Sequence, residues 1–259
     1  MMTKDFNNLN CDEESQRYYE FLEPKETICG DHSWYQINFG DVTLYEVCFD
    51  KTALVPIYAK YTLTKWTQVT LVTPQSYDLN ARSTPLFAGT DVTTLYNSIK
   101  PPKVIPGKLV NAEDFLYPQE IASTFEYINT APLYGTINSG NWRGMADSVR
   151  YLLQSNYIDG AFKIWTGTIT EGTLKYLDTT KKKIPYPKWF WKVIYDETSE
   201  KGVVLFIYNN PKSQEANVNT EFKSLCTEDP NLIRQINWLY NINFEDVTRG
   251  IIYACPFAS

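Results

Sequence analysis

Five short runs of β-branched and aromatic residues limit what this chain can fold into. Two of them, VTLYEVCF and IYAKYTLTKW, lie within residues 35–73 and partly alternate between apolar and polar positions. The other three are FKIWTG, WFWKVIYD and VVLFIY, at residues 162–167, 189–196 and 203–208. Such runs, bounded by turn residues, are typical of strands in a sheet that is buried on at least one face.

Helical patterns are fewer. A helix is predicted to begin at Pro118 and to end near Tyr127, because proline is favoured in the first turn of a helix. A second is predicted from about Asn141 to Gln154, where apolar residues recur at helical spacing. Those residues are Met145, Val149, Leu152 and Leu153. A last helix is expected at residues 230–240, and residues 74–104, with few periodic signals, are expected to form a long surface segment.

The order of these elements predicts an α+β fold, with a mixed, largely antiparallel sheet and helices packed on it. Residues 1–28 are expected to form an acidic arm with a short helix from Asp12 to Leu22, which Pro24 ends. Residues 29–259 are expected to form one domain, since a chain of this length can bury a large core.

The formal net charge of −6 is concentrated at the N-terminus. Residues 1–28 carry seven acidic and three basic residues, which gives −4 and leaves −2 for the rest of the chain. Because phosphate affinity comes mainly from lysine and arginine, this composition does not favour nucleic acid as a partner.

No apolar run approaches the roughly 18 residues that a membrane-spanning helix needs, so a membrane partner is not expected. The first ten residues, MMTKDFNNLN, lack the apolar region of a secretory signal. The sequence therefore predicts an intracellular protein, in the cytoplasm or the nucleus.

The segment from Val104 to Arg150 is the most informative about function. It opens with VIPGKLVNAEDF and continues through YINTAPLYGTINSGNW into RGMADSVR. This order resembles the DNA/RNA non-specific endonucleases of the ββα-metal (His-Me finger) class. That family shows Asp-Arg-Gly-His, a Leu-x-Pro-Ala-x-x-Phe-like run, Leu-Asn-x-x-x-Trp, and then a helix carrying Glu and Arg. FKIWTGTI and IPYPKWFWKVIYD resemble later segments of the family. The resemblance covers residues 29–255 and is closest to the arthropod secreted branch.

The resemblance implies that the catalytic groups of the family are missing. Its Asp-Arg-Gly-His positions are filled here by Ile105, Pro106, Gly107 and Lys108. A lysine thus replaces the imidazole that acts as general base. We expect Lys108 to be protonated at neutral pH and unable to accept a proton, unless burial lowers its pKa.

The resemblance also implies a depleted metal site. The acidic residue on the family's helix aligns with Ala146, and its metal-binding asparagine aligns with Asn138. An amide oxygen alone is a weak ligand for a hard cation. The polar groups of the motif that remain are Asn129, Asn138 and Arg150. We therefore expect a degenerate, catalytically inactive member of the family with no metal and no other cofactor.

By the same resemblance, two disulfides are expected, Cys29–Cys48 and Cys226–Cys255. Cys11 is then left over, either as a free thiol or in an intermolecular disulfide. The chain has a single histidine, His32, which we expect on a surface turn near a disulfide.

A second basic feature is the run Lys181, Lys182 and Lys183. It is either a solvated loop beside a core strand or a remnant phosphate-binding patch. In the second case, Tyr186, Trp189 and Trp191 would be available to stack bases.

Three functions follow as hypotheses. The first is a structural, self-associating pseudoenzyme, which fits a virus-encoded or storage-type dense assembly and agrees with the high aromatic content of 15%. The second is a module that binds nucleic acid without cutting it, through Arg150 and residues 181–183. The third is a weak metal-dependent nuclease with Lys108 as an unusual base.

Overall fold

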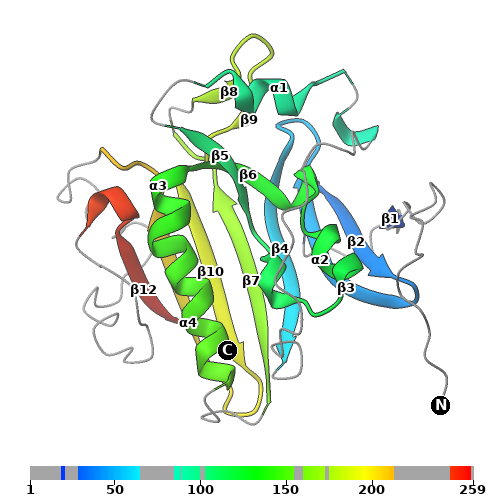
Figure 1. Cartoon of the computed structure of the whole chain (residues 1–259), viewed down its shortest axis with the longest axis vertical. Helices are drawn as coiled ribbons and strands as arrows, with labels where there is room; N and C mark the ends of the chain where they lie inside the picture. Colours follow the sequence, from blue (N-terminus) through cyan, green and yellow to red (C-terminus); the bar gives the residue numbers. More distant parts are fainter. Residues whose placement is uncertain are drawn as a thin grey trace.

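An eight-stranded sheet forms the centre of the protein in a computed structural model of the chain (Figure 1). The structure describes the backbone of residues 19–20 and residues 29–64, 85–87, 89–99, 103–154, 160–172, 175–212 and 246–257. In sheet order the strands are β1 (Tyr19–Glu20), β2 (Ser33–Phe39), β3 (Val42–Asp50), β4 (Val55–Thr64), β7 (Ala161–Ile169), β10 (Trp189–Asp196), β11 (Lys201–Tyr208) and β12 (Ile252–Phe257). Each strand is antiparallel to its neighbours.

Two short hairpins and several helices complete the described part. The hairpins pair β5 (Val104–Lys108) with β6 (Thr130–Tyr134), and β8 (Tyr176–Asp178) with β9 (Lys183–Pro185). The α-helices are α1 (Val92–Asn97), α2 (Pro118–Ser123), α3 (Gly135–Ile137) and α4 (Arg143–Gln154). A π-helical turn, η7 (Asn138–Trp142), joins α3 to α4. The 3-10 turns are η4 (Pro85–Phe87), η5 (Ala112–Asp114), η6 (Tyr127–Asn129) and η8 (Val247–Arg249).

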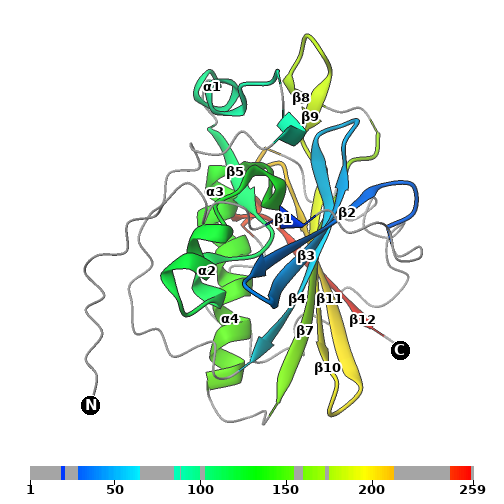
Figure 2. The ribbon, with the colours of Figure 1, turned by 90° about the vertical axis from the view of Figure 1, so that its right-hand side faces the viewer.

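Helices α2, α3 and α4 lie on the same face of the large sheet (Figure 2). Helix α4 turns its predicted apolar side inward, so that Met145, Val149 and Leu153 are buried. At its start, Trp142 packs edge-on against Phe190 of β10, with ring centroids 5.3 Å apart. This face of the sheet therefore forms the main core, and the predicted α+β class with a largely antiparallel sheet is confirmed.

The strand predictions hold closely. Strand β10 has the predicted bounds, and β7 and β11 extend the predicted segments by one to two residues at their ends. Within residues 35–64 the strand-like sequence forms β2, β3 and β4, whereas residues 65–73 lie outside the described part.

The helix predictions are less accurate. Helix α2 begins at Pro118 as predicted but ends at Ser123, and a 3-10 turn follows it. Helix α1 was not predicted: it lies within the supposed surface segment 74–104, and the Asp91 side chain caps it by accepting from the Thr94 amide at 3.0 Å. The predicted helix at 230–240 lies outside the described residues.

Of the predicted arm, only Tyr19 and Glu20 are described, and there the predicted helix is wrong. These two residues form strand β1 and pair with Ile37 and Gln36 of β2. The open edge of β2 offers backbone groups that favour an added strand over the end of a helix.

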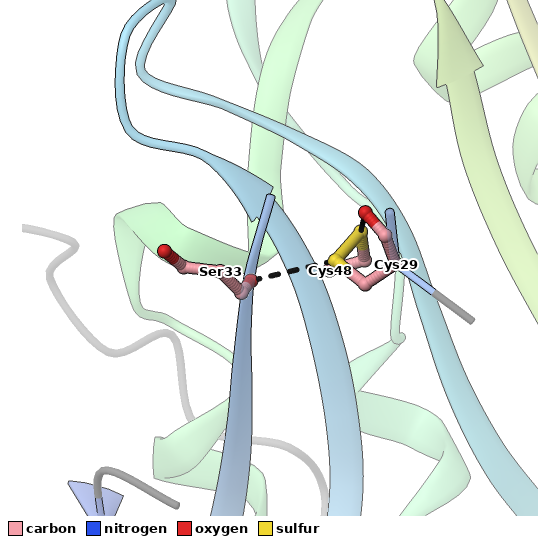
Figure 3. The surroundings of a disulfide bond; sticks show 3 residues. All are labelled: Cys29, Ser33 and Cys48. Carbon is pink, nitrogen blue, oxygen red and sulfur yellow. Dashed lines mark hydrogen bonds between the residues drawn. A yellow bond between two sulfur atoms is a disulfide. The ribbon is translucent and has the colours of Figure 1, made fainter. Parts of the chain in front are cut away.

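The predicted Cys29–Cys48 disulfide is present (Figure 3). It ties the segment before β2 to strand β3, and the Cys29 sulfur lies 3.7 Å from the Ser33 carbonyl oxygen. His32 is exposed, and its amide donates to the Cys29 carbonyl at 3.2 Å, which confirms a surface turn beside a disulfide. Cys255 is also disulfide-bonded, but Cys226 and Cys11 lie outside the described residues.

None of the helices in the described ranges has the length and apolar character needed to cross a lipid bilayer.

Candidate functional site

The motif segment forms a hairpin that leads to a helix. Strand β5 pairs with β6 along its whole length, from Val104 opposite Tyr134 to Lys108 opposite Thr130. The chain then turns through α3 and η7 into α4, which lies beside the hairpin (Figure 1). The indole Nε1 of Trp142 donates to the carbonyl of Lys108 at 3.2 Å and joins the end of β5 to the start of the helix. Two strands and a helix thus meet at Lys108.

Gly107, the glycine that the motif retains, leaves no room for a side chain. A Cβ atom at Gly107 would lie 2.5 Å from the Cβ of Leu133, a fully buried residue of β6. Real Cβ atoms do not approach so closely, so a larger residue here would separate β5 from β6.

A cavity of about 310 Å³ opens where the hairpin meets the helix. Five of the seven predicted site positions line it, namely Pro106, Lys108, Asn138, Ala146 and Arg150. Ile105 and Asn129 do not. The hairpin and the helix therefore bring these five positions of the motif to one place.

The burial of Asn129 shows a structural role. Its Oδ1 accepts from the Val110 amide, and its Nδ2 donates to the carbonyls of Val110 and Thr124, each at 2.9 Å. This fully buried side chain fixes the loop that follows β5. Asn129, which was expected among the site positions, does not line the cavity, and its described hydrogen bonds are to backbone groups of Val110 and Thr124.

Six further residues line the cavity and were not predicted as site positions: Asn111, Ala112, Glu113, Phe125, Trp142 and Arg143. Asn111 and Glu113 directly follow the motif lysine in VNAEDF, so their position beside the motif is a signal for them. Phe125 and Arg143 reach the cavity only through the tertiary fold.

Lys108 meets the exception named for it from the sequence, because it is partly buried. Burial lowers the pKa of Lys108 to about 7, and the nearby carboxylate of Glu113 only partly opposes this shift. Its Nζ lies over the Phe125 ring, 2.8 Å from the centroid, and forms no ion pair with a described residue. Near pH 7 the neutral amine is therefore about as abundant as the ammonium.

Arg150 lines the cavity but forms ion pairs with two carboxylates. Its Nη1 lies 2.8 Å from Oδ1 of Asp114, and its Nη2 contacts Asp147. Asp114 is buried and also accepts a hydrogen bond of 2.7 Å from the hydroxyl of Tyr61. Arg150 therefore holds the helix to the loop after β5, with little capacity left for a ligand.

Lys192 of β10 is close enough to Asp114 and Arg150 for both charges to affect its pKa, and it was not predicted as a site residue. It is 1% exposed, and its Nζ donates to Thr166 Oγ1 at 2.6 Å. Burial lowers the pKa of Lys192 to about 8, although Asp114 acts to raise it. The Nζ also lies 5.5 Å from the centre of the Trp142 ring, which lines the cavity.

The basic run 181–183 lies away from the cavity lining. Lys181 and Lys182 are exposed in the turn between β8 and β9. The Nζ of Lys181 donates to the Gly89 carbonyl at 2.9 Å, and that of Lys183 donates to the Thr52 carbonyl. Stacking of bases on Trp189 was a wrong expectation, because this ring is buried against Tyr208, with centroids 4.8 Å apart.

The hairpin, the helix and the cavity between them define a nuclease-like fold. The chain belongs to the DNA/RNA non-specific endonuclease family, whose profile matches residues 33–257. A chain from a crystal structure of the EndoG/EndoGI complex has a similar fold, with a TM-score of 0.50 at 17% identity, over 81% of this chain and 85% of that one. The predicted family and the predicted ββα-metal nuclease-like fold are thereby confirmed.

Three relatives similar in sequence are named as salivary proteins. A salivary endonuclease of Lutzomyia longipalpis is 27% identical over 80% of this chain and 56% of its own length. The salivary protein Tsal1 of Glossina morsitans morsitans is 27% identical over 59% of this chain and 38% of its own length. A salivary endonuclease of Culex quinquefasciatus is 28% identical over 51% and 36%, respectively. The chain thus spans about half the length of these relatives, or less.

The cavity does not fit the divalent cation that the family implies. Asn138 offers an amide and Glu113 a carboxylate, but Asp114 and Asp147 are ion-paired with Arg150. Magnesium in proteins is usually bound by one or two carboxylates together with waters and substrate phosphates. Here two arginines and a lysine line the same space. Across the described residues, no group of three or more His, Cys, Asp or Glu could hold a metal ion.

Proposed function

We propose that the chain is a catalytically inactive member of its family that binds phosphodiesters of nucleic acid in the cavity without hydrolysing them. The observation that carries this proposal is the set of groups in the cavity. Lys108 and Arg143 provide hydrogen-bond donors and positive charge, whereas Ala146 supplies no carboxylate, Asp114 and Asp147 are ion-paired, and Glu113 is the one lining carboxylate without an ion pair among the described residues.

Loss of hydrolysis rests on the metal ligands more than on the base. Because the pKa of Lys108 is about 7, a neutral amine is present to accept a proton. Hydrolysis in this family also needs a cation to stabilise the charge that develops on the phosphate and the leaving oxygen. Ala146 supplies no ligand at the helix position, and Arg143 and Arg150, which line the same cavity as Asn138, would repel a metal.

Binding is expected to be weak and dependent on salt. With Arg143 cationic and Lys108 only about half protonated near pH 7, log K is expected to fall with log salt concentration with a slope between about −1 and −2. Arg143, whose side chain is 67% exposed, contributes one of these cationic contacts, so Arg143→Ala is expected to change that slope by about one. Fluorescence anisotropy of a labelled duplex over a salt series measures both values.

The matched control is Lys201→Ala, because Lys201 is exposed on β11 and does not line the cavity. An unchanged slope in Arg143→Ala, or an equal change in Lys201→Ala, would contradict binding at this site.

A second candidate is the structural, self-associating role. Phe39 and Val42, opposite each other at the end of the β2–β3 hairpin, are 38% and 62% exposed. Adjacent exposed apolar side chains are common where proteins associate. We propose this surface as a contact between copies of the chain, with Cys11 as a further link in a dense assembly.

Sedimentation velocity tests that role. Val42→Lys is expected to lower the sedimentation coefficient to that of a monomer, and Cys11→Ser is expected to remove any species that reductant also removes. A wild-type protein that is monomeric with and without reductant rejects self-association.

The compartment in which the protein acts is also a proposal. The relatives are named as salivary proteins, and the structure contains the Cys29–Cys48 disulfide. Structural disulfides persist mainly in oxidising compartments. Both observations argue against the intracellular location expected from the sequence, and we propose that the protein acts in an oxidising compartment.

A further inference from the structure

We propose that Lys108 is a covalent binding site for an aldehyde that carries a phosphate group near its carbonyl, held as an imine. Only the nucleic-acid source of such an aldehyde rests on the proposed function. The lysine lines the cavity of about 310 Å³, so a ligand in that cavity reaches its amine. Among the described residues, no ion pair holds the amine away from the cavity.

The amine at this position is reactive because it is desolvated. A solvated lysine, with a pKa near 10.4, has about one neutral amine in a thousand at pH 7.4. Lys108 has a pKa of about 7, so more than half of it is neutral at that pH. Lysines in apolar surroundings are activated as nucleophiles toward carbonyl carbons in this way. The Phe125 ring beneath Nζ provides those surroundings.

Two other cavity residues favour an anion beside the aldehyde. Arg143 is exposed, and its described ion pair, with Asp147, is long at 3.7 Å. Asn111 lines the same cavity, and its Nδ2 is buried without a hydrogen-bond partner among the described residues. A phosphate oxygen would accept hydrogen bonds from both, and charge-assisted bonds of this kind are among the stronger ones.

The chemistry balances without a cofactor. The Lys108 nitrogen attacks the carbonyl carbon, a C–N bond forms, and the carbonyl oxygen takes a proton to give a carbinolamine. The hydroxyl then leaves with a second proton as water, and a C=N bond remains. Glu113, the carboxylate in the cavity, is placed to accept the proton from nitrogen and to return it to the departing hydroxyl. No oxidant or reductant is consumed.

Borohydride trapping tests the proposal, because it reduces an imine to a stable secondary amine. The full chain is incubated with pyridoxal 5′-phosphate near pH 7.5 and reduced, and the labelled lysines are mapped by mass spectrometry. We expect Lys108 to be labelled at least about tenfold more than exposed Lys201. Pyridoxal, which lacks the phosphate, is expected to label Lys108 about tenfold less.

Mapping of the wild-type protein does not depend on a variant that folds. Lys108→Arg, which keeps the charge but forms no imine, should lose the dominant label, whereas Lys201→Arg should keep it. Equal labelling of Lys108 and Lys201, or equal labelling by pyridoxal and its phosphate, would overturn the proposal.

A second arm identifies the source of the aldehyde. A duplex with one abasic site is compared with the intact duplex of the same sequence, with reduction and a denaturing gel. A cross-link to the abasic duplex that Lys108→Arg abolishes supports the site and assigns it to damaged nucleic acid. Labelling of Lys108 by pyridoxal 5′-phosphate without a cross-link supports the site and assigns it to small aldehyde phosphates. If fluorescence anisotropy shows no binding of the intact duplex while pyridoxal 5′-phosphate still labels Lys108, the proposed binding of intact nucleic acid is rejected. The proposed imine site is then still supported.

Discussion

Replacing Arg150 by methionine is expected to lower the free energy of unfolding by about 3 to 5 kcal/mol. The arginine side chain is 12% exposed and its partner Asp114 is 3% exposed, so the change leaves a buried carboxylate without its ion-pair partner. Of the hydrogen bonds that described side chains donate to that carboxylate, the one from the Tyr61 hydroxyl, at 2.7 Å, then remains. Urea unfolding followed by circular dichroism measures the loss.

Two further variants identify the cause. Arg143→Met removes an exposed arginine with a single long ion pair, and a loss of less than about 0.5 kcal/mol is expected. Asp114→Asn in the Arg150→Met background should recover part of the lost stability, since it removes the buried charge. An Arg150→Met protein as stable as the wild type would show that the pair is not important for stability.

The stability of the protein is expected to rise between pH 7 and pH 9.5. Lys108 and Lys192 have pKa values of about 7 and about 8 in the folded protein, below the value near 10.4 of an unfolded chain. Between these folded-state values and about pH 10.4, the unfolded chain therefore binds more protons at the two lysines than the folded protein does. The free energy of unfolding consequently rises with pH over this interval. It is expected to increase by about 2 to 4 kcal/mol between about pH 7 and pH 9.5.

Variants separate this effect from other titrations. Lys192→Met and Lys108→Met should each reduce the slope, and Lys201→Met should leave it unchanged. The range ends near pH 9.5 because Tyr45 and Tyr61 have pKa values raised by burial, and they oppose the effect above about pH 10. A free energy of unfolding that is flat or falls from pH 7 to pH 9.5 would contradict the low pKa values.

Strands and the long helix were predictable because their patterns are long and local. Strand β10 has the predicted bounds, and α4 presents the predicted apolar side. Helix α1 has only six residues and depends on the Asp91 cap, and β5 contains a proline, so neither has a strong periodic pattern. Short elements such as these take their conformation from caps and from pairing with distant segments.

The site was predictable in position but less so in chemistry. Motif spacing placed Lys108, Asn138 and Ala146 together, and they line one cavity. The pKa of Lys108 depends on burial against Phe125, and Arg150 is neutralised by Asp114, which is 36 residues away in sequence. Such contacts between distant residues decide which groups can contact a ligand. They could not be predicted from a single sequence, because no local pattern of residues indicates them.

We propose that this cavity does not hold the metal ion needed for phosphodiester hydrolysis. Nicking of a supercoiled plasmid with magnesium or manganese tests it most directly, with the wild type and Lys108→Met compared at equal concentration. The account predicts that neither protein nicks the plasmid faster than buffer with the same metal. Metal-dependent nicking by the wild type that Lys108→Met abolishes would contradict the account and make the lysine a catalytic base.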